Sequence, residues 1–297
     1  MGLVPLGLVL AVVLTVAIGT VVVRRSPPSR ETAVAAGRAH AMHAAAAAVL
    51  LGALATGYVG ATGLGNGSPG GLGVTALLMP ITFGIVHTVV LAAGELTWPR
   101  PQGEVRRARL VHRGLLDAAP RWLVRLAGLA LAMATATLVT GALLADGDGR
   151  SVSYGYEVGQ VSGLSSASPF PGAFYGLPTG IGLLVLALVT AVKLRIVASR
   201  PAVATADEGI ESALRRASVH RVLRVAVGVP LFVAGGLLFV GGRSLHSVAT
   251  STVSSGLLDA AGAAAALIGG AAMLVGVVVA CLRAPGVPAD AAAVPVG

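Results

Sequence analysis

The residues of this sequence that could do chemistry are the few ionisable side chains inside its long apolar stretches. His87 stands near the middle of the stretch 74–97, and the stretch 122–144 carries Thr135 and Thr137. An ionisable side chain in the hydrocarbon core of a membrane is costly unless it pairs or lines a polar cavity, so its presence indicates function. Two interpretations stay open: a neutral His87 bonded to one of these threonines, or a sparse polar lining for a solute or a proton.

A second pair of side chains carries opposite charges. Glu95 and Lys193 each lie fifteen residues after a proline, Pro80 and Pro178 respectively. If the segments that carry them are repeats, the two side chains have equal depth and can pair, which would close the inner end of a helix bundle. The alternative is that both extend to the aqueous interface, as long charged side chains do near helix ends, and merely stay solvated.

Other patterns associated with catalysis fail on context. Residues 65–70 read G-x-G-x-x-G, but they follow an apolar helix rather than a strand. The single Cys281 excludes a multi-cysteine metal site. Haem would need a second axial ligand at the depth of His87, where only Met133 or Met273 could serve. There is no Walker lysine, H-E-x-x-H or G-x-S-x-G motif, and we therefore predict a noncatalytic chain with no cofactor and no metal.

The elements that position these residues follow from composition. Of the 297 residues, 55% are hydrophobic and 11% charged, with mean hydropathy +0.86, whereas charged residues make up about 25% of a soluble domain. This predicts an all-α, polytopic transmembrane bundle, with residues 1–297 forming a single integral membrane domain. Seven stretches approach the roughly 20 apolar residues that a crossing requires: 3–23, 42–63, 74–97, 122–144, 174–197, 222–241 and 257–282.

Basic residues predict how the bundle is oriented. With the N-terminus outside and the C-terminus inside, all 21 basic residues except Arg150 and Arg243 fall on the cytoplasmic side, as the positive-inside rule requires. The first stretch is expected to be a retained helix, because it lacks a basic n-region and ends in Arg24-Arg25. The net charge of +9 thus serves orientation and predicts contact with the lipid bilayer, not with nucleic acid.

One outer connection, residues 145–173, is long enough to fold over the mouth of the bundle. It carries Asp146, Asp148, Glu157 and several aromatic residues. An acidic aromatic lid is one interpretation. A loosely packed interfacial loop with its rings at headgroup level is the other.

The spans show a threefold order. Odd-numbered spans open with a proline and a nearby glycine, and even-numbered spans are preceded by Arg-Ala and a histidine. This predicts parallel two-helix repeats over 3–63, 74–144 and 174–241, plus an extra helix over 257–282. Transporters use such repeats and place binding sites between them. In the extra helix, Gly262, Ala266 and Gly270 form a small-residue stripe suited to close helix contact, within the chain or with a partner.

The segment Ser168-Pro-Phe-Pro-Gly-Ala-Phe-Tyr-Gly-Leu-Pro178, followed by a span that ends in Arg200-Pro201, resembles a pattern in multi-pass membrane proteins of high-GC actinobacteria. The resemblance covers about a third of the chain. It implies a bacterial plasma membrane and carries no activity with it. The expected function is a noncatalytic subunit or scaffold that docks to a membrane-protein partner or to a second copy, because no acidic side chain lies at the midplane of a predicted span. The alternative is a transporter-like permease that binds a small solute between hairpins.

Overall fold

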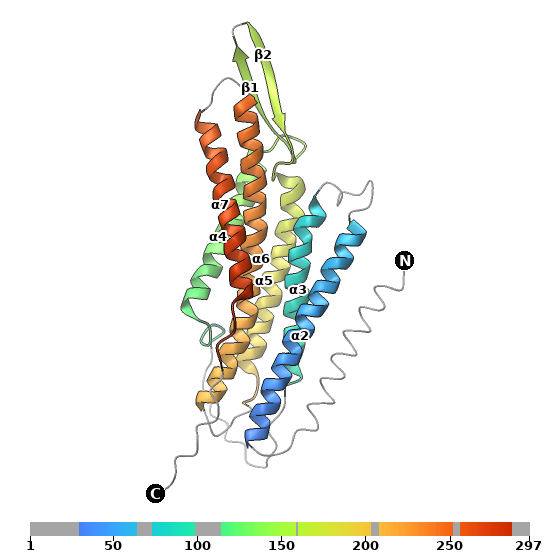
Figure 1. Cartoon of the computed structure of the whole chain (residues 1–297), viewed down its shortest axis with the longest axis vertical. Coiled ribbons are helices and arrows are strands. Elements are labelled where there is room, and N and C mark those ends of the chain that lie inside the picture. The colour runs from blue at the N-terminus through green and yellow to red at the C-terminus, as the bar shows by residue number, and fades with distance from the viewer. Residues whose placement is uncertain are drawn as a thin grey trace.

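The computed structural model describes residues 30–63, 73–98, 114–158, 160–202, 208–251 and 256–286. Within these segments the chain forms six long helices and one two-stranded hairpin (Figure 1). The helices are α2 (Arg30–Gly63), α3 (Val74–Leu96), α4 (Arg121–Leu144), α5 (Ala173–Ser199), α6 (Glu208–Ser251) and α7 (Gly256–Cys281). Each is long and apolar enough to cross a membrane, so the chain is an integral membrane protein. The expected first span, 3–23, lies outside the described residues, and the seven-span count stays a prediction.

Successive helices run in opposite directions (Figure 1). We call the end where α2, α4 and α6 begin the inner end, and the opposite end the outer end. Among the described residues, every arginine and lysine except Arg150 and Arg243 lies in the inner half of the bundle. The basic residues that the sequence assigned to one side of the membrane therefore gather at one end of the folded bundle.

Helix α6 is the central element. It packs against α3, α4, α5 and α7, and its 44 residues span about 66 Å at 1.5 Å per residue. This is about twice the roughly 30 Å thickness of a hydrocarbon core, so the helix extends well beyond the expected span 222–241. The largest apolar cluster surrounds it and includes Leu91, Leu123, Leu194, Val222 and Val279.

Glycines join α7 to α6. A Cβ atom on Gly269 of α7 would lie 2.5 Å from the carbonyl oxygen of Gly235 on α6, so the two backbones touch. Gly262 and Ala266 are buried in the same contact. The predicted stripe is thus used within the chain, with one correction: Gly269, not Gly270, continues it. A Cβ on Gly270 would have its nearest neighbour 3.8 Å away, because position 270 is turned to the edge of this interface.

The outer connection contains an antiparallel hairpin, β1 (Val152–Val158) and β2 (Val161–Ala167), which corrects the all-α expectation. Valines and tyrosines alternate along β1 with serine, glycine and glutamate, a period of two that favours a strand. Tyr156 pairs with Gly163 and its ring covers that glycine. The base packs on α6 through Val152, Phe170 and Val248. The hairpin projects beyond the outer end rather than covering it (Figure 1), so it is neither a loose loop nor a lid in this structure.

The helices of the predicted repeat 74–144 do not pack mainly on each other. Helix α3 packs on α2, α5 and α6, whereas α4 packs chiefly on α6 and to a lesser extent on α5. The repeat 74–144 would make α3 and α4 partners. The threefold repeat stays a prediction, since the first helix of 3–63 lies outside the described residues.

Candidate functional site

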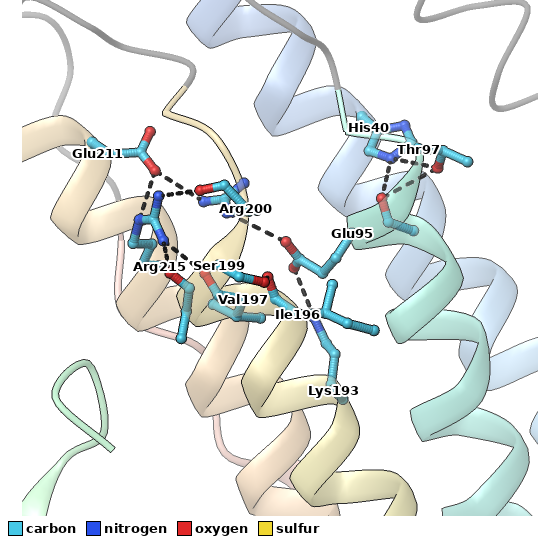
Figure 2. A network of polar contacts seen from close by, with 12 residues as sticks. His40, Glu95, Thr97, Lys193, Ile196, Val197, Ser199, Arg200, Glu211 and Arg215 are labelled. Carbon is cyan, nitrogen blue, oxygen red and sulfur yellow. Dashed lines mark hydrogen bonds and ion pairs between the residues drawn. The ribbon is translucent and has the colours of Figure 1, made fainter. Parts of the chain in front are cut away.

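Charged side chains from α3, α5 and the first turns of α6 converge at the inner end of the bundle (Figure 2). They are Glu95, Lys193, Arg200, Glu211 and Arg215, and we call them the buried charge cluster. Their side chains are between 1% and 7% exposed. A group of five charges so well shielded from solvent is rare in proteins unless its members pair.

The two charged residues that the sequence singled out meet in this cluster. Lys193 Nζ lies 2.7 Å from Glu95 Oε1, joining the last turn of α3 to the second-last turn of α5. The Lys193 side chain is 1% exposed, so the alternative of a solvated side chain reaching the interface is wrong. Figure 2 shows the two side chains pointing toward each other between α3 and α5.

Arg200 links the pair to α6. Its Nε lies 3.4 Å from Glu95 Oε2, and its Nη2 lies 3.5 Å from Glu211 Oε1. The guanidinium also lies over the Trp98 ring, 4.1 Å from the centroid, a cation–π contact. Pro201 explains this position: a residue before proline avoids the helical region, and Arg200 is extended with φ −63° and ψ 146°, which ends α5 there.

Arg215 binds the end of α5 from the next helix. Its Nε donates to Glu211 Oε1 at 2.8 Å, and Nη1 and Nη2 donate to the carbonyl oxygens of Val197 and Arg200, each at 2.7 Å. The last carbonyls of a helix have no partner within that helix, and a cation there is favoured by the helix dipole. Arg215 therefore caps α5 and holds α5 and α6 together.

A second contact ties α2 to the end of α3. His40 Nε2 lies 2.8 Å from the Gly94 carbonyl oxygen and 3.3 Å from Thr97 Oγ1. The His40 ring meets the edge of Trp98, the ring on which Arg200 lies. These contacts connect α2 to the buried charge cluster at the inner ends of α3, α5 and α6.

The buried charge cluster is incompletely satisfied. Three of its members are cationic and two are anionic, and none of the three Arg200 guanidinium nitrogens has a hydrogen bond of normal geometry within the described residues. A cavity of about 10 Å³ lies beside it, lined by Glu95, Lys193, Ser218 and Arg221 among others, which is about the space that one water needs. A fully satisfied buried polar network makes a core rigid, whereas an unpaired buried polar group is costly.

His87 lies apart from this cluster, eight residues or about 12 Å deeper along α3. Its side chain is buried at 2% exposed and stacks on Phe83 with 5.6 Å between ring centroids. Its Nδ1 has no hydrogen bond, so the expected bond to Thr135 or Thr137 is absent. The reason is that α4 packs on α6 and α5, and Thr135 is exposed on it.

Among the described residues, no group of three or more histidine, cysteine, aspartate or glutamate side chains is arranged to hold a metal ion. Sequence reasoning missed Arg200, Glu211 and Arg215 as members of the site. The Arg200-Pro201 dipeptide and the four-residue spacing of Glu211 and Arg215 were the available signals.

Comparisons of this chain with known protein families, with curated proteins and with solved structures give no match. The functional interpretation therefore depends on the geometry of the chain itself.

Proposed function

We propose that this integral membrane protein is a noncatalytic, transporter-like permease in which the buried charge cluster holds the inner end of the bundle closed. The observation that carries the proposal is the contact between Lys193 Nζ and Glu95 Oε1, 2.7 Å apart with side chains 1% and 6% exposed. The small solute would bind between helices on the outer side of this closure, near His87.

Stability gives no reason to keep these charges. A buried ion pair costs so much desolvation that well-packed apolar residues of similar size often serve as well or better. Charged groups buried in a membrane bundle instead mark pathways and moving parts. A cluster that joins α3, α5 and α6 through ion pairs is suited to a gate, because water entering the cluster would solvate each ion and release all three helices together.

The same three helices carry the features that would let them bend. Pro80 lies inside α3, Pro178 inside α5 and Pro230 inside α6. Proline removes a backbone hydrogen bond and is the commonest cause of helix kinks. In the proposed cycle the inner segments move relative to the outer ones at these positions.

The proposed topology has seven spans, with the N-terminus outside, the C-terminus inside, and a bacterial plasma membrane as the location. It is supported by the distribution of basic residues: among the described residues, only Arg150 and Arg243 lie in the outer half. In this orientation the buried charge cluster is a cytoplasmic gate.

The alternative is a noncatalytic subunit or scaffold that docks to a membrane-protein partner or forms a homo-oligomer. The sequence favours it because no acidic side chain lies at midplane depth in the predicted spans, as a proton or ion relay would need, and because the small-residue stripe of α7 offers a docking face. Since Gly262 and Ala266 are occupied by α6 within the chain, that stripe no longer favours a partner, and we prefer the permease. In a scaffold, the buried charge cluster would be a static clamp.

The test is solvent access to the cluster. We would replace Cys281 by serine, introduce a reporter thiol by Ser218→Cys beside the small cavity, and treat inside-out vesicles with a membrane-impermeant maleimide. A gate predicts that Glu95→Gln raises the labelling rate at least tenfold in protein that remains folded, as judged by protease resistance. The matched control is Glu157→Gln, because Glu157 is exposed on β1, and it should leave labelling unchanged. A folded Glu95→Gln protein that labels no faster than its parent would support the static clamp and contradict the gate.

A further inference from the structure

A groove of about 290 Å³ lies in the outer half of the bundle, on the opposite side of the midplane from the buried charge cluster. Parts of α3, α6, α7 and the segment before α5 line it, and almost all of the lining is apolar. We call it the outer groove. Its residues include Leu77, Pro80, Phe170, Phe232, Gly236 and Met273. Its volume is close to the lower end of the range for ligand pockets, about 300–1,000 Å³.

The length of the outer groove matches one leaflet of a bilayer. Along α6 its lining runs from Phe232 to Val240, eight residues or about 12 Å. Along α3 it runs from Gly73 at the helix N-terminus to Pro80, about 10 Å. One leaflet contributes about 15 Å to the hydrocarbon core. The groove therefore extends from the outer interface almost to the midplane.

One basic side chain lies where a lipid headgroup would be. Arg243 follows Val240 by three residues and Gly236 by seven, so it shares their face of α6, about one turn nearer the outer end. It is exposed, and it has no ion pair within the described residues. The other outer basic residue, Arg150, has its Nε 3.4 Å from Asp148 Oδ2.

We propose that the outer groove holds one acyl chain of an anionic phospholipid, whose phosphate pairs with Arg243. Apolar cavities stay free of water and take apolar guests, and in a bilayer the guest at highest concentration is the acyl chain. The position of Arg243 supplies the charge that complements the phosphate. This inference uses residues of the outer half and does not rest on the proposed gate.

The experiment uses the full chain in vesicles that contain phosphatidylglycerol with a photoreactive diazirine in its acyl chain. After irradiation, adducts are mapped by mass spectrometry. We expect enrichment at Leu77, Leu237 and Met273 over the exposed lipid-facing Leu131 and Leu267. Adducts spread evenly over all five leucine and methionine positions would indicate bulk annular lipid only and would overturn the proposal.

Two pairs of variants separate the groove from the headgroup site. Gly236→Leu fills the groove, and its Cβ has no neighbour closer than 3.9 Å, so the protein should fold. Gly236→Leu should lower the number of adducts at groove residues severalfold. Gly57→Leu on α2, where a Cβ has no neighbour within 4 Å, should leave that number unchanged. Arg243→Gln should lower the preference for phosphatidylglycerol over phosphatidylcholine about fivefold, the equivalent of one surface cation, and Arg150→Gln should not. Unchanged adducts in folded Gly236→Leu would refute the chain site, and an unchanged preference in Arg243→Gln would refute the phosphate contact.

Discussion

Removing one charge from the Glu95–Lys193 pair should have a different effect depending on which charge is removed. Glu95 has two cations near it, Lys193 Nζ at 2.7 Å and Arg200 Nε at 3.4 Å. Glu95→Gln leaves a buried lysine with no carboxylate, and breaking a buried pair in this way costs about 3–5 kcal/mol. Lys193→Met leaves Glu95 with Arg200 as a partner, so we expect a loss below about 3 kcal/mol.

The double variant supplies the decisive comparison. With Glu95→Gln and Lys193→Met together, no lysine is left without a carboxylate, and Arg200 keeps Glu211 as its partner. Replacing a buried ion pair by uncharged residues is often nearly neutral. The free energy of unfolding should therefore be higher for the double variant than for Glu95→Gln alone, by at least about 1 kcal/mol. The assay is reversible unfolding in mixed micelles, with far-UV circular dichroism as the readout.

The exposed pair at the outer end provides the control. Arg150 and Asp148 are 45% and 41% exposed, and surface ion pairs contribute about 0–1 kcal/mol. Arg150→Gln should lie within that range. If the losses for Glu95→Gln and Lys193→Met simply add in the double variant, the two side chains are not coupled, and the reasoning about the pair is refuted.

Three further predictions concern other parts of the bundle. Gly269→Leu should destabilise the protein by about 1–3 kcal/mol or more, because its Cβ would lie 2.5 Å from the Gly235 carbonyl oxygen. Gly270→Leu should be tolerated. Thermal unfolding compares the two variants, and equal losses of stability would contradict the assignment of Gly269 to the stripe. His87→Leu should preserve or raise thermal stability, since it removes a buried nitrogen that has no hydrogen bond; a loss above about 2 kcal/mol would reveal a partner for the ring. Hydrogen bonds from the Arg150 backbone N–H and then the Ser151 hydroxyl lower the pKa of Asp148 from 3.8 to about 2, so its stabilisation of the hairpin base is present above pH 3.8 and is lost as the pH falls through 2. Protease cleavage of the hairpin across this range should depend on pH in the parent and not in Asp148→Asn.

Much of the fold could be predicted from the sequence because a membrane constrains a chain so strongly. Apolar length located all six described helices, and basic residues located their inner ends. The equal spacing of Glu95 and Lys193 after a proline made their pairing one of two interpretations, and the ion pair in the structure agrees with that one. Apolar length and flanking charge are properties of each segment alone, so they can be recognised without knowing which helices are neighbours.

The remaining members of the buried charge cluster could not be predicted in this way. Arg200, Glu211 and Arg215 look like ordinary residues of an inner loop, where basic side chains are expected for orientation alone. They become buried because Pro201 ends α5 and α6 begins at Glu208, well before its apolar span, and packs back against α5. The four-residue spacing of Glu211 and Arg215 indicates that they share one face of a helix. It does not indicate that this face packs against α5, because that contact is tertiary.

The hairpin was missed for a different reason. Its strands have seven residues each and are rich in serine and glycine, which are also typical of loops. Its stability depends on the contact of Val152 and Phe170 with α6, which is distant in sequence. The hydrogen bond expected between His87 and Thr135 or Thr137 is absent for a similar reason. The sequence indicates how deep a residue lies along its helix, but not which helix packs beside it.

The central claim is that Lys193 and Glu95 pair inside the bundle when the protein is in a membrane. Lys193 is the only lysine in the chain, so a single ¹⁵N label on lysine Nζ reports this site alone. A solid-state NMR dipolar-recoupling measurement in lipid bilayers, between that nitrogen and the ¹³C-labelled side-chain carboxyl carbons of glutamate, tests the contact directly. The structure predicts strong dephasing, consistent with Nζ at 2.7 Å from Glu95 Oε1, and loss of that dephasing in Glu95→Gln. No dephasing in the parent protein would contradict the pair and, with it, the proposed closure.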